Sequence, residues 1–244
     1  MNHPLQAFLS HYHLDRMWSN YQKAVADGTI PNLRSLGLPE LGRHKWLGFT
    51  NLPKLKGGVD PQPVKKLLEL WRKIQGKDAA AMQKDFTQSS FPAMERQIFD
   101  LCMALLHATK TARVTAMREL LEAGVPVNFQ HPVTKQSALH IAAGCASKSV
   151  VDLLVATQRC NFLLRDQYER IPWNMAHFFN PDSSIEKLLL KMTKEQAQRK
   201  SVNLLTEHKE QLRKWTHQEW YYAALRIKYD ESGIYQPTIG NDFS

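Results

Sequence analysis

The sequence is poor in cysteine. Its 244 residues include three, Cys102, Cys145 and Cys160, which is an odd number at wide spacing with no Cys-x-x-Cys pair. A disulfide framework or a structural zinc site is therefore not expected, and reduced thiols in a cytoplasm-like compartment fit this usage better. We accordingly predict an intracellular, cytoplasmic protein with no metal site.

Long hydrophobic runs are also missing. The most apolar stretch, residues 98–108, contains Asp100 and is well short of the roughly twenty residues that a membrane helix needs. Residues 1–5 (MNHPL) are not a basic segment leading into an apolar run, so no classical secretory signal is expected. The sequence thus predicts no membrane span.

The common signatures of enzyme sites are absent as well. Gly57-Gly58 lacks the Lys-Ser or third Gly of a phosphate loop. His11 and His13 would point about 200° apart on a helix, which disfavours a shared metal ion. Cys145 lies near His140, but we favour a structural role for both over a thiol nucleophile and its base. We predict no cofactor, and an enzyme with a site in the first 90 residues remains an open alternative.

The overall composition is that of an ordinary folded protein. Hydrophobic residues make up 43% and charged residues 23%, with 11 Gly and 12 Pro, which excludes a collagen-like or wholly disordered chain. Lys and Arg outnumber Asp and Glu by 32 to 23, giving a formal charge of +9. A basic chain of this length can hold one or two domains and permits nucleic acid, acidic protein or anionic membrane as partner.

Three segments in the middle of the chain repeat one another. They begin at Met103, Ser137 and Ile171 and read MALLHA, SALHIA and IPWNMA, each starting 34 residues after the one before. About a dozen residues after each lies a second apolar block. The pattern predicts a unit of a short helix, a turn, a second amphipathic helix and a loop.

This unit resembles the ankyrin repeat. Residues 137–143 (SALHIAA) are similar to the Thr-Pro-Leu-His-x-Ala-Ala signature, and residues 119–128 (ELLEAGVPVN) to its Leu-Leu-x-x-Gly-Ala-Asp-Val-Asn close. In that close, Gly124 supplies the left-handed helix stop. The first and third copies depart from the signature, the third with Ile171 for Thr and Asn174 for His, as end repeats do. The resemblance implies about three repeats over residues 98–192.

The flanking regions are expected to be helical, so the predicted fold is all-α: a short ankyrin-type helical solenoid clasped by N- and C-terminal helical flanks. The N-terminal region, residues 1–97, contains an amphipathic helix over 4–26 and a Pro/Gly-rich irregular segment over 28–60. Further helices are expected from Asp60-Pro61 and after Ser90.

Residues 193–244 are predicted to form C-terminal capping helices and a tail. Capping boxes begin at Ser183, Thr193 and Thr216. We expect one long helix over residues 194–229, or two broken near Trp215 and Thr216. Both flanks then act as caps on one continuous body.

The resemblance implies a non-catalytic module that binds a protein partner through loop tips and a concave face. The tips correspond to residues 130–136 and 164–170, and Phe178 and Phe179 are candidate apolar anchors whose alternative is packing against the C-terminal helix. The candidate partner-binding residues are His131, Lys135, Arg165, Asp166, Tyr168, Arg170, Phe178 and Phe179. The identity of the partner is left open.

A nucleic-acid or phosphate-binding protein is the main alternative. The positive charge is spread evenly along the chain, so no segment is a basic arm, but local clusters could form a patch on folding. These clusters comprise Arg43, Lys45, Lys54, Lys56, Lys65, Lys66, Arg72 and Lys73. Short ankyrin proteins also occur among effectors that bacteria deliver into host cells, so by analogy that role stays open too.

Overall fold

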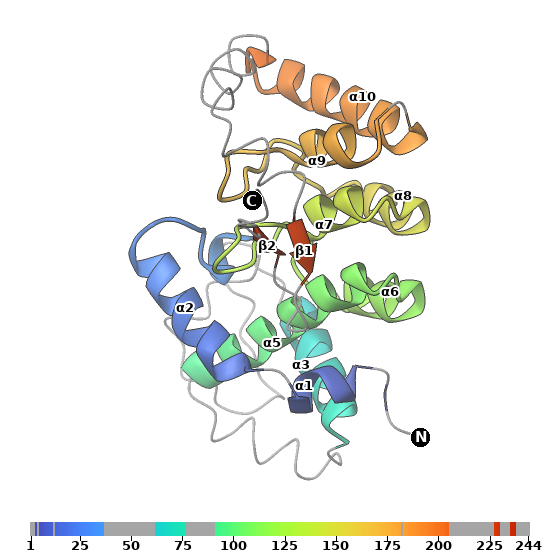
Figure 1. The fold of residues 1–244 in the computed structure, drawn as a ribbon. Coiled ribbons are helices and arrows are strands. Elements are labelled where there is room, and N and C mark those ends of the chain that lie inside the picture. Colours follow the sequence, from blue (N-terminus) through green and yellow to red (C-terminus); the bar gives the residue numbers. More distant parts are fainter. Residues whose placement is uncertain are drawn as a thin grey trace, which may run out of the picture. The chain divides into compact units, whose positions relative to one another are not determined.

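The computed structural model describes residues 3, 5–11, 13–36, 62–76, 91–181, 183–204, 227–229 and 235–237, and these residues are predominantly helical. Their elements are shown in Figure 1. In chain order they are α1 (Gln6–His11), α2 (Leu14–Ala26), the 3-10 helix η1 (Leu33–Leu36), α3 (Gln62–Gln75), α5 (Phe91–Lys110), α6 (Val114–Ala123), α7 (Ala138–Gly144), α8 (Lys148–Ala156), α9 (Pro172–Phe179), α10 (Ser184–Arg199), β1 (Ile227–Tyr229) and β2 (Tyr235–Pro237). The all-α class predicted from the sequence is confirmed, with the two three-residue strands as a small addition.

The chain divides into two compact units. The N-terminal unit comprises residues 1–108 and 113–129, and the C-terminal unit comprises residues 109–112 and 130–244. The division falls within the region that resembles ankyrin repeats, after the second helix of the first copy. The domain boundaries predicted from the sequence remain a prediction.

The first helical segment is interrupted, whereas its sequence pattern predicted one helix over residues 4–26. α1 ends at His11 and α2 begins at Leu14, with His13 (φ −67°, ψ 53°) outside helical geometry. The apolar spacing continues through the break, so the pattern alone gives no sign of it. α2 then ends as expected before Gly28, which adopts φ +67°.

An aromatic cluster forms the core of the N-terminal unit. Phe99 of α5 contacts Tyr21 and Trp18 of α2, with ring centroids 5.1 and 5.2 Å apart, and meets Phe129 edge-on at 5.8 Å. The Tyr21 hydroxyl accepts a hydrogen bond from the Leu33 backbone N–H (2.9 Å) and donates to Glu95 (3.1 Å). The aromatic rings therefore join α2 to α5, and the polar tip of Tyr21 is satisfied where it is buried.

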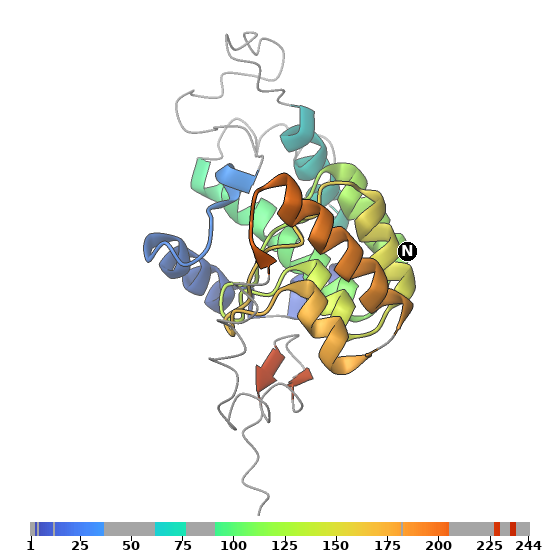
Figure 2. The ribbon, with the colours of Figure 1, turned by 90° about the horizontal axis from the view of Figure 1, so that it is seen from above.

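In the C-terminal unit, α7 packs against both α8 and α9, and α9 packs against α10. Figures 1 and 2 show these helices as two successive pairs, with the connecting loops of α7 and α9 beside each other. Small buried residues in these helices, such as Ala142 and Ala176, allow the close approach of α7 and α9. α7 and α9, which contain the second and third copies of the signature segment, thus pack side by side.

The helix boundaries recur with the 34-residue spacing of the sequence. α5 ends at Lys110 and α7 at Gly144, α6 begins at Val114 and α8 at Lys148, and α7 begins at Ala138 and α9 at Pro172. Helix-ending backbone hydrogen bonds recur too, since Arg113 N–H to Ala108 O (2.9 Å) is matched by Ser147 N–H to Ala142 O (3.2 Å). The sequence repeat is therefore a repeat of local structure.

Left-handed backbone positions follow the same spacing. Ala112 and Ala146 have φ of 51° and 52°, Lys135 and Glu169 have 54° and 61°, and Gly124 is matched by Gln158 at 98° and 55°. Each pair is 34 residues apart. Glycine stands at one of these six positions, although a side chain at positive φ is strained.

Gln158 offers a test of this strain. Gln158→Gly is expected to stabilise the C-terminal unit by about 0.5–1 kcal/mol, because relief of left-handed strain outweighs the added entropy of the unfolded chain. Urea unfolding monitored by circular dichroism measures the change. Gln158→Ala, which keeps a Cβ, is the control and is expected to give no such gain; an equal gain from alanine would contradict the explanation.

α10 begins at its expected cap but does not end where the sequence suggested. Ser183 Oγ accepts a hydrogen bond from the Glu186 N–H at 3.1 Å. The second capping box, at Thr193, starts no helix: Thr193 is buried within α10. α10 ends at Arg199, and Ser201 follows at φ +55°, so the prediction of one helix over residues 194–229 is wrong.

Farther along the chain, β1 and β2 pair in antiparallel fashion with Lys228 opposite Gln236. The predicted capping box at Thr216 lies outside the described residues, as do residues 37–60 of the irregular segment predicted over 28–60. None of the helices in the described ranges is both long enough and apolar enough to cross a membrane.

Candidate functional site: two hydrogen-bonded loops

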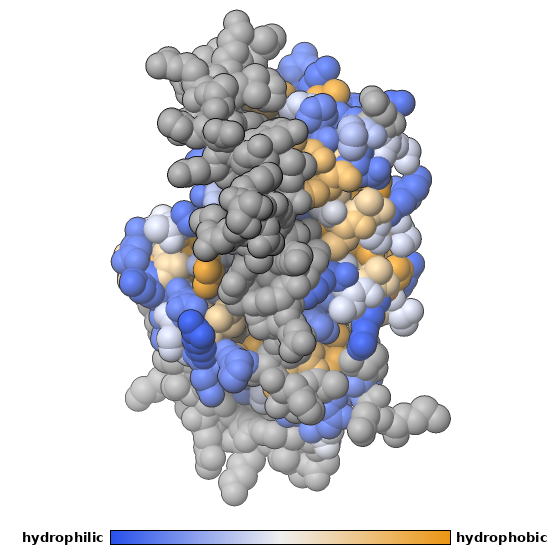
Figure 3. Space-filling model, viewed as in Figure 1, coloured by the Kyte–Doolittle hydropathy of each residue, from blue (hydrophilic) through white to orange (hydrophobic). Residues whose placement is uncertain are grey.

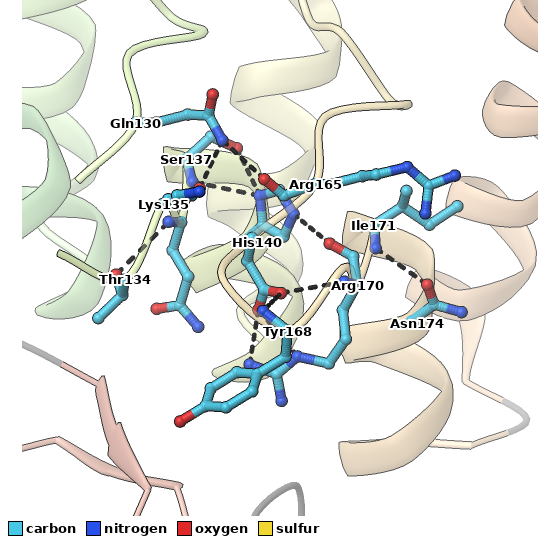
Figure 4. Close-up of polar contacts among 12 residues, drawn as sticks. Gln130, Thr134, Lys135, Ser137, His140, Arg165, Tyr168, Arg170, Ile171 and Asn174 are labelled. Atoms are coloured by element: carbon cyan, nitrogen blue, oxygen red, sulfur yellow. Dashed lines mark hydrogen bonds and ion pairs between the residues drawn. The ribbon is translucent and has the colours of Figure 1, made fainter. Parts of the chain in front are cut away.

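The loops that precede α7 and α9 in the C-terminal unit are joined by hydrogen bonds (Figure 4). The Gln130 side-chain amide donates to the carbonyl oxygens of Lys135 in its own loop (2.7 Å) and Arg165 in the next (2.8 Å). The Gln167 backbone N–H donates to Thr134 O at 3.0 Å. One buried amide and one backbone bond therefore hold the loops over residues 130–137 and 164–171 together.

His140, in the first turn of α7, also links these two loops. Its Nδ1 accepts from the Ser137 backbone N–H (3.2 Å) and hydroxyl (2.8 Å), and its Nε2 lies 2.9 Å from Arg170 O. An amide N–H only donates and a carbonyl only accepts, so the imidazole must carry its proton on Nε2. His140 is thus a neutral, fully paired connector.

The surroundings of His140 oppose its protonation. Burial lowers the pKa of the imidazole below its usual value, and the nearby Asp166 carboxylate offsets this only in part. Because Ser137 and Arg170 engage both ring nitrogens, the ring is not aimed at the Cys145 thiol. This supports the structural interpretation of the pair.

α9 repeats the arrangement with a different side chain. Asn174 Oδ1 accepts from the Ile171 backbone N–H at 2.9 Å, 34 residues after the Ser137–His140 bond. An amide oxygen replaces the imidazole nitrogen as the cap of the helix N-terminus. The substitution of Asn174 for the signature His therefore keeps the local cap.

A buried ion pair shapes the second loop. Arg170 donates from Nε (2.8 Å) and Nη2 (2.6 Å) to Asp166 Oδ2, while Asp166 Oδ1 accepts from the backbone N–H groups of Tyr168 (2.9 Å) and Arg170 (3.0 Å). The side chains of Asp166 and Arg170 are 0% and 1% exposed. One carboxylate thus satisfies four donors and fixes the path of residues 166–170.

Tyr168 lies over this ion pair. The Arg170 guanidinium carbon is 4.8 Å from the centre of the Tyr168 ring, a cation–π distance. Figure 4 shows the ring directed away from the hydrogen-bonded network. Burial raises the pKa of the Tyr168 hydroxyl, so it is a neutral donor at physiological pH.

Three of the predicted partner-binding side chains are buried, which corrects the expectation that they are exposed at loop tips. His131 is 4%, Asp166 2% and Arg170 1% exposed. The reason is local pairing: His131 Nδ1 accepts from the backbone N–H groups of Val133 (3.2 Å) and Thr134 (3.3 Å), and Asp166 and Arg170 neutralise each other. These three side chains therefore stabilise the conformation of the loops and do not form their accessible surface.

The other predicted residues are partly accessible. Lys135, Arg165 and Tyr168 all lie on the two joined loops, so the structure brings these three together. The Arg165 guanidinium donates to Glu169 O at 3.1 Å. Phe178 and Phe179 are half-buried near the end of α9, where the Phe178 ring meets His177 edge-on at 5.7 Å, and they are not part of the loop network.

Of the predicted nucleic-acid-binding residues, the structure describes the four on α3. Arg72 is 1% exposed, and the Lys73 ammonium is 2.6 Å from Glu119. The Arg72 guanidinium atoms Nε and Nη1 are themselves inaccessible to solvent, so neither can meet a phosphate. Lys66 is exposed, and Lys65 lies on α3. Arg43, Lys45, Lys54 and Lys56 fall outside the described residues. Arg72 is thus no phosphate contact, which corrects that expectation.

Sequence reasoning missed two contributors to the loop surface. Gln130 is the amide that joins the loops, and Val133 is the large apolar side chain that is exposed among the described residues, at 42%. An exposed Val between Pro132 and Thr134 at a turn was a signal that could have been read. Figure 3 shows hydrophilic side chains interspersed with smaller apolar areas over the described part of the visible face.

The described residues contain no group of three His, Cys, Asp or Glu side chains arranged to hold a metal ion. Cys102, Cys145 and Cys160 form no disulfide, and burial raises the pKa of Cys102 and Cys160. A scan against protein-family models finds no match to this chain, and a search of curated proteins finds no significant match either.

Proposed function

We propose that this protein is a non-catalytic interaction module of the ankyrin type, which binds a protein partner through the joined loops of its C-terminal unit. Three helix pairs, α5/α6, α7/α8 and α9/α10, correspond to the three sequence copies. Their recurring boundaries and left-handed positions support a repeat origin.

The observation that carries the proposal is the bonding between loops. Gln130, His140 and the Thr134–Gln167 backbone bond hold adjacent loops in one arrangement before any partner arrives. A surface ordered in advance loses little conformational entropy on binding, which favours affinity. Pairing through buried groups leaves Lys135, Arg165 and Tyr168 accessible for contact.

The test is affinity purification of the full chain with quantitative mass spectrometry. A Lys135→Glu/Arg165→Glu variant reverses the charge of the loop surface. We expect the partner's enrichment to fall roughly tenfold or more, as for loss of a few central contacts. The matched control is Lys187→Glu/Lys191→Glu, which makes the same charge change on exposed residues of α10.

The outcomes separate the alternatives. Equal loss in both variants, or no loss in either, would show that the loops are not the binding surface. Recovery of RNA or DNA, with a salt-dependent gel shift, would favour the nucleic-acid alternative. If the wild-type chain enriches no protein at all, the interaction function itself is overturned.

A further inference from the structure

We infer that Tyr168 is the anchor of the loop surface, and that it takes a peptide segment in which a carboxylate stands next to an apolar side chain. This inference rests on the proposed function.

The ion pair is an unusual way to support a surface loop. Removing two charges from water costs about as much as their attraction returns, so such a pair does little for stability but selects one conformation. Here that conformation is the path of residues 166–170, because Asp166 accepts from the Tyr168 and Arg170 backbone N–H groups. The buried ion pair thus fixes the position of Tyr168.

Both the backbone and the ring of Tyr168 are held. Asp166 fixes the backbone N–H at 2.9 Å, and the Arg170 guanidinium lies 4.8 Å from the ring centre on one side. The hydroxyl end points away from the network (Figure 4). A fixed aromatic side chain loses little freedom on binding, and Tyr is enriched among residues that dominate interface energies. Asp166 and Arg170 are therefore positioning residues for Tyr168.

The neighbours of Tyr168 indicate what it binds. The Thr134 O–Gln167 N bond places the first loop beside the second, with Lys135 next to Thr134 and Tyr168 next to Gln167. Among the described residues, no carboxylate lies within ion-pair distance of the Lys135 ammonium. Val133, on the other side of Thr134, is 42% exposed.

These three side chains specify a partner chemistry. Lys135 offers a cation that has no carboxylate partner within the described part of the chain, Val133 an exposed apolar side chain, and Tyr168 a ring with a hydroxyl donor. A carboxylate from the partner would pair with Lys135, and an apolar side chain beside it would cover Val133 and the Tyr168 ring. Nucleic acid fits less well, because Arg165 lies 3.9 Å from the Glu169 carboxylate and is compensated by it, and Arg170 is buried against Asp166. Lys135 is then a single cation on the two loops, whereas a phosphate backbone is held by several.

The experiment uses a random dodecamer peptide library displayed on phage, panned on the 244-residue chain. We expect the enriched peptides to carry Glu or Asp next to an aliphatic or aromatic residue. Enrichment of basic peptides would overturn the assigned partner chemistry. The selected peptide, fluorescently labelled, then serves as the probe for dissociation constants by anisotropy.

Variants of Tyr168 test the anchor. Tyr168→Ala is expected to raise the dissociation constant of the selected peptide about thirtyfold, which is typical for loss of a dominant aromatic contact. Tyr168→Phe keeps the ring and should stay within about threefold. Lys187→Ala on α10 is the surface control and should change nothing. If Tyr168→Ala binds as wild type while Lys135→Glu does not, the anchor is overturned and the proposed function stands.

The positioning role has its own test, which leaves folding intact. Asp166→Asn/Arg170→Met removes both charges and keeps an acceptor for the Tyr168 N–H, so the melting temperature should stay close to wild type. Binding of the selected peptide should fall about tenfold, because the ring loses the cation beneath it. Unchanged affinity would refute positioning by the pair. If the library enriches no peptide on the wild-type chain, the proposed function fails along with this inference.

Discussion

Replacing Arg170 with alanine is expected to destabilise the C-terminal unit by about 3–5 kcal/mol, because Asp166 is left charged and unpaired in the interior. The Arg170 side chain supplies two of the four hydrogen bonds that Asp166 accepts, from Nε and Nη2. Both side chains are essentially inaccessible, at 0% and 1% exposure, so water cannot replace the lost partner. This is one of the two largest effects that we expect from a single substitution.

The measurement is urea unfolding by circular dichroism, with hydrogen-exchange mass spectrometry to assign the loss to the C-terminal unit. The matched control is Lys148→Ala, which removes an exposed ion pair with Asp152 and should cost about 0.5 kcal/mol or less. The charge-free variant Asp166→Asn/Arg170→Met should lose far less than Arg170→Ala. If Arg170→Ala costs under about 1 kcal/mol, the pair is open to solvent and the description of the loop is wrong.

The regular part of the repeat could be predicted from the sequence because it is local. The apolar spacing that begins at Ser137 and Ile171 indicates two helices, and α7 and α9 start one residue after each. α5 likewise begins at Phe91, as expected after Ser90. Such elements depend on side-chain periodicity and on capping by residues three positions away, which are readable along the chain.

The burial of charged side chains in the loops could not be predicted from the sequence pattern. Asp166 and Arg170 resemble exposed tip residues until their mutual distance is known, since charged residues are rarely fully buried without a partner. At Thr193 the local pattern predicted a helix start that the structure does not have. The sequence matches a capping box there, but Leu189, Thr193 and Ala197 lie on one buried face of α10, and packing of that face overrides the local signal.

A second large effect is expected at His140. His140→Ala should cost about 2–4 kcal/mol, because the Ser137 N–H and Arg170 O are left unsatisfied in a buried site. His140→Asn should cost less, since the amide oxygen of Asn174 already performs the same capping on Ile171. The Asn variant keeps the cap and loses the link to Arg170, so the difference between the two variants isolates the cap. Equal costs would mean that the cap contributes nothing.

The same residue makes stability depend on pH. Because burial lowers the folded-state pKa of His140, the unfolded chain takes up a proton below about pH 6.5 while the folded chain resists it. Stability is therefore unaffected by His140 above that pH and decreases as the pH falls below it, by up to about 1.4 kcal/mol per pH unit. His140→Asn removes this contribution, so the stability difference between wild type and variant should shrink from pH 7 to pH 5. A difference that stays constant over that range would show that His140 is protonated equally in both states, against the neutral tautomer that Ser137 and Arg170 require.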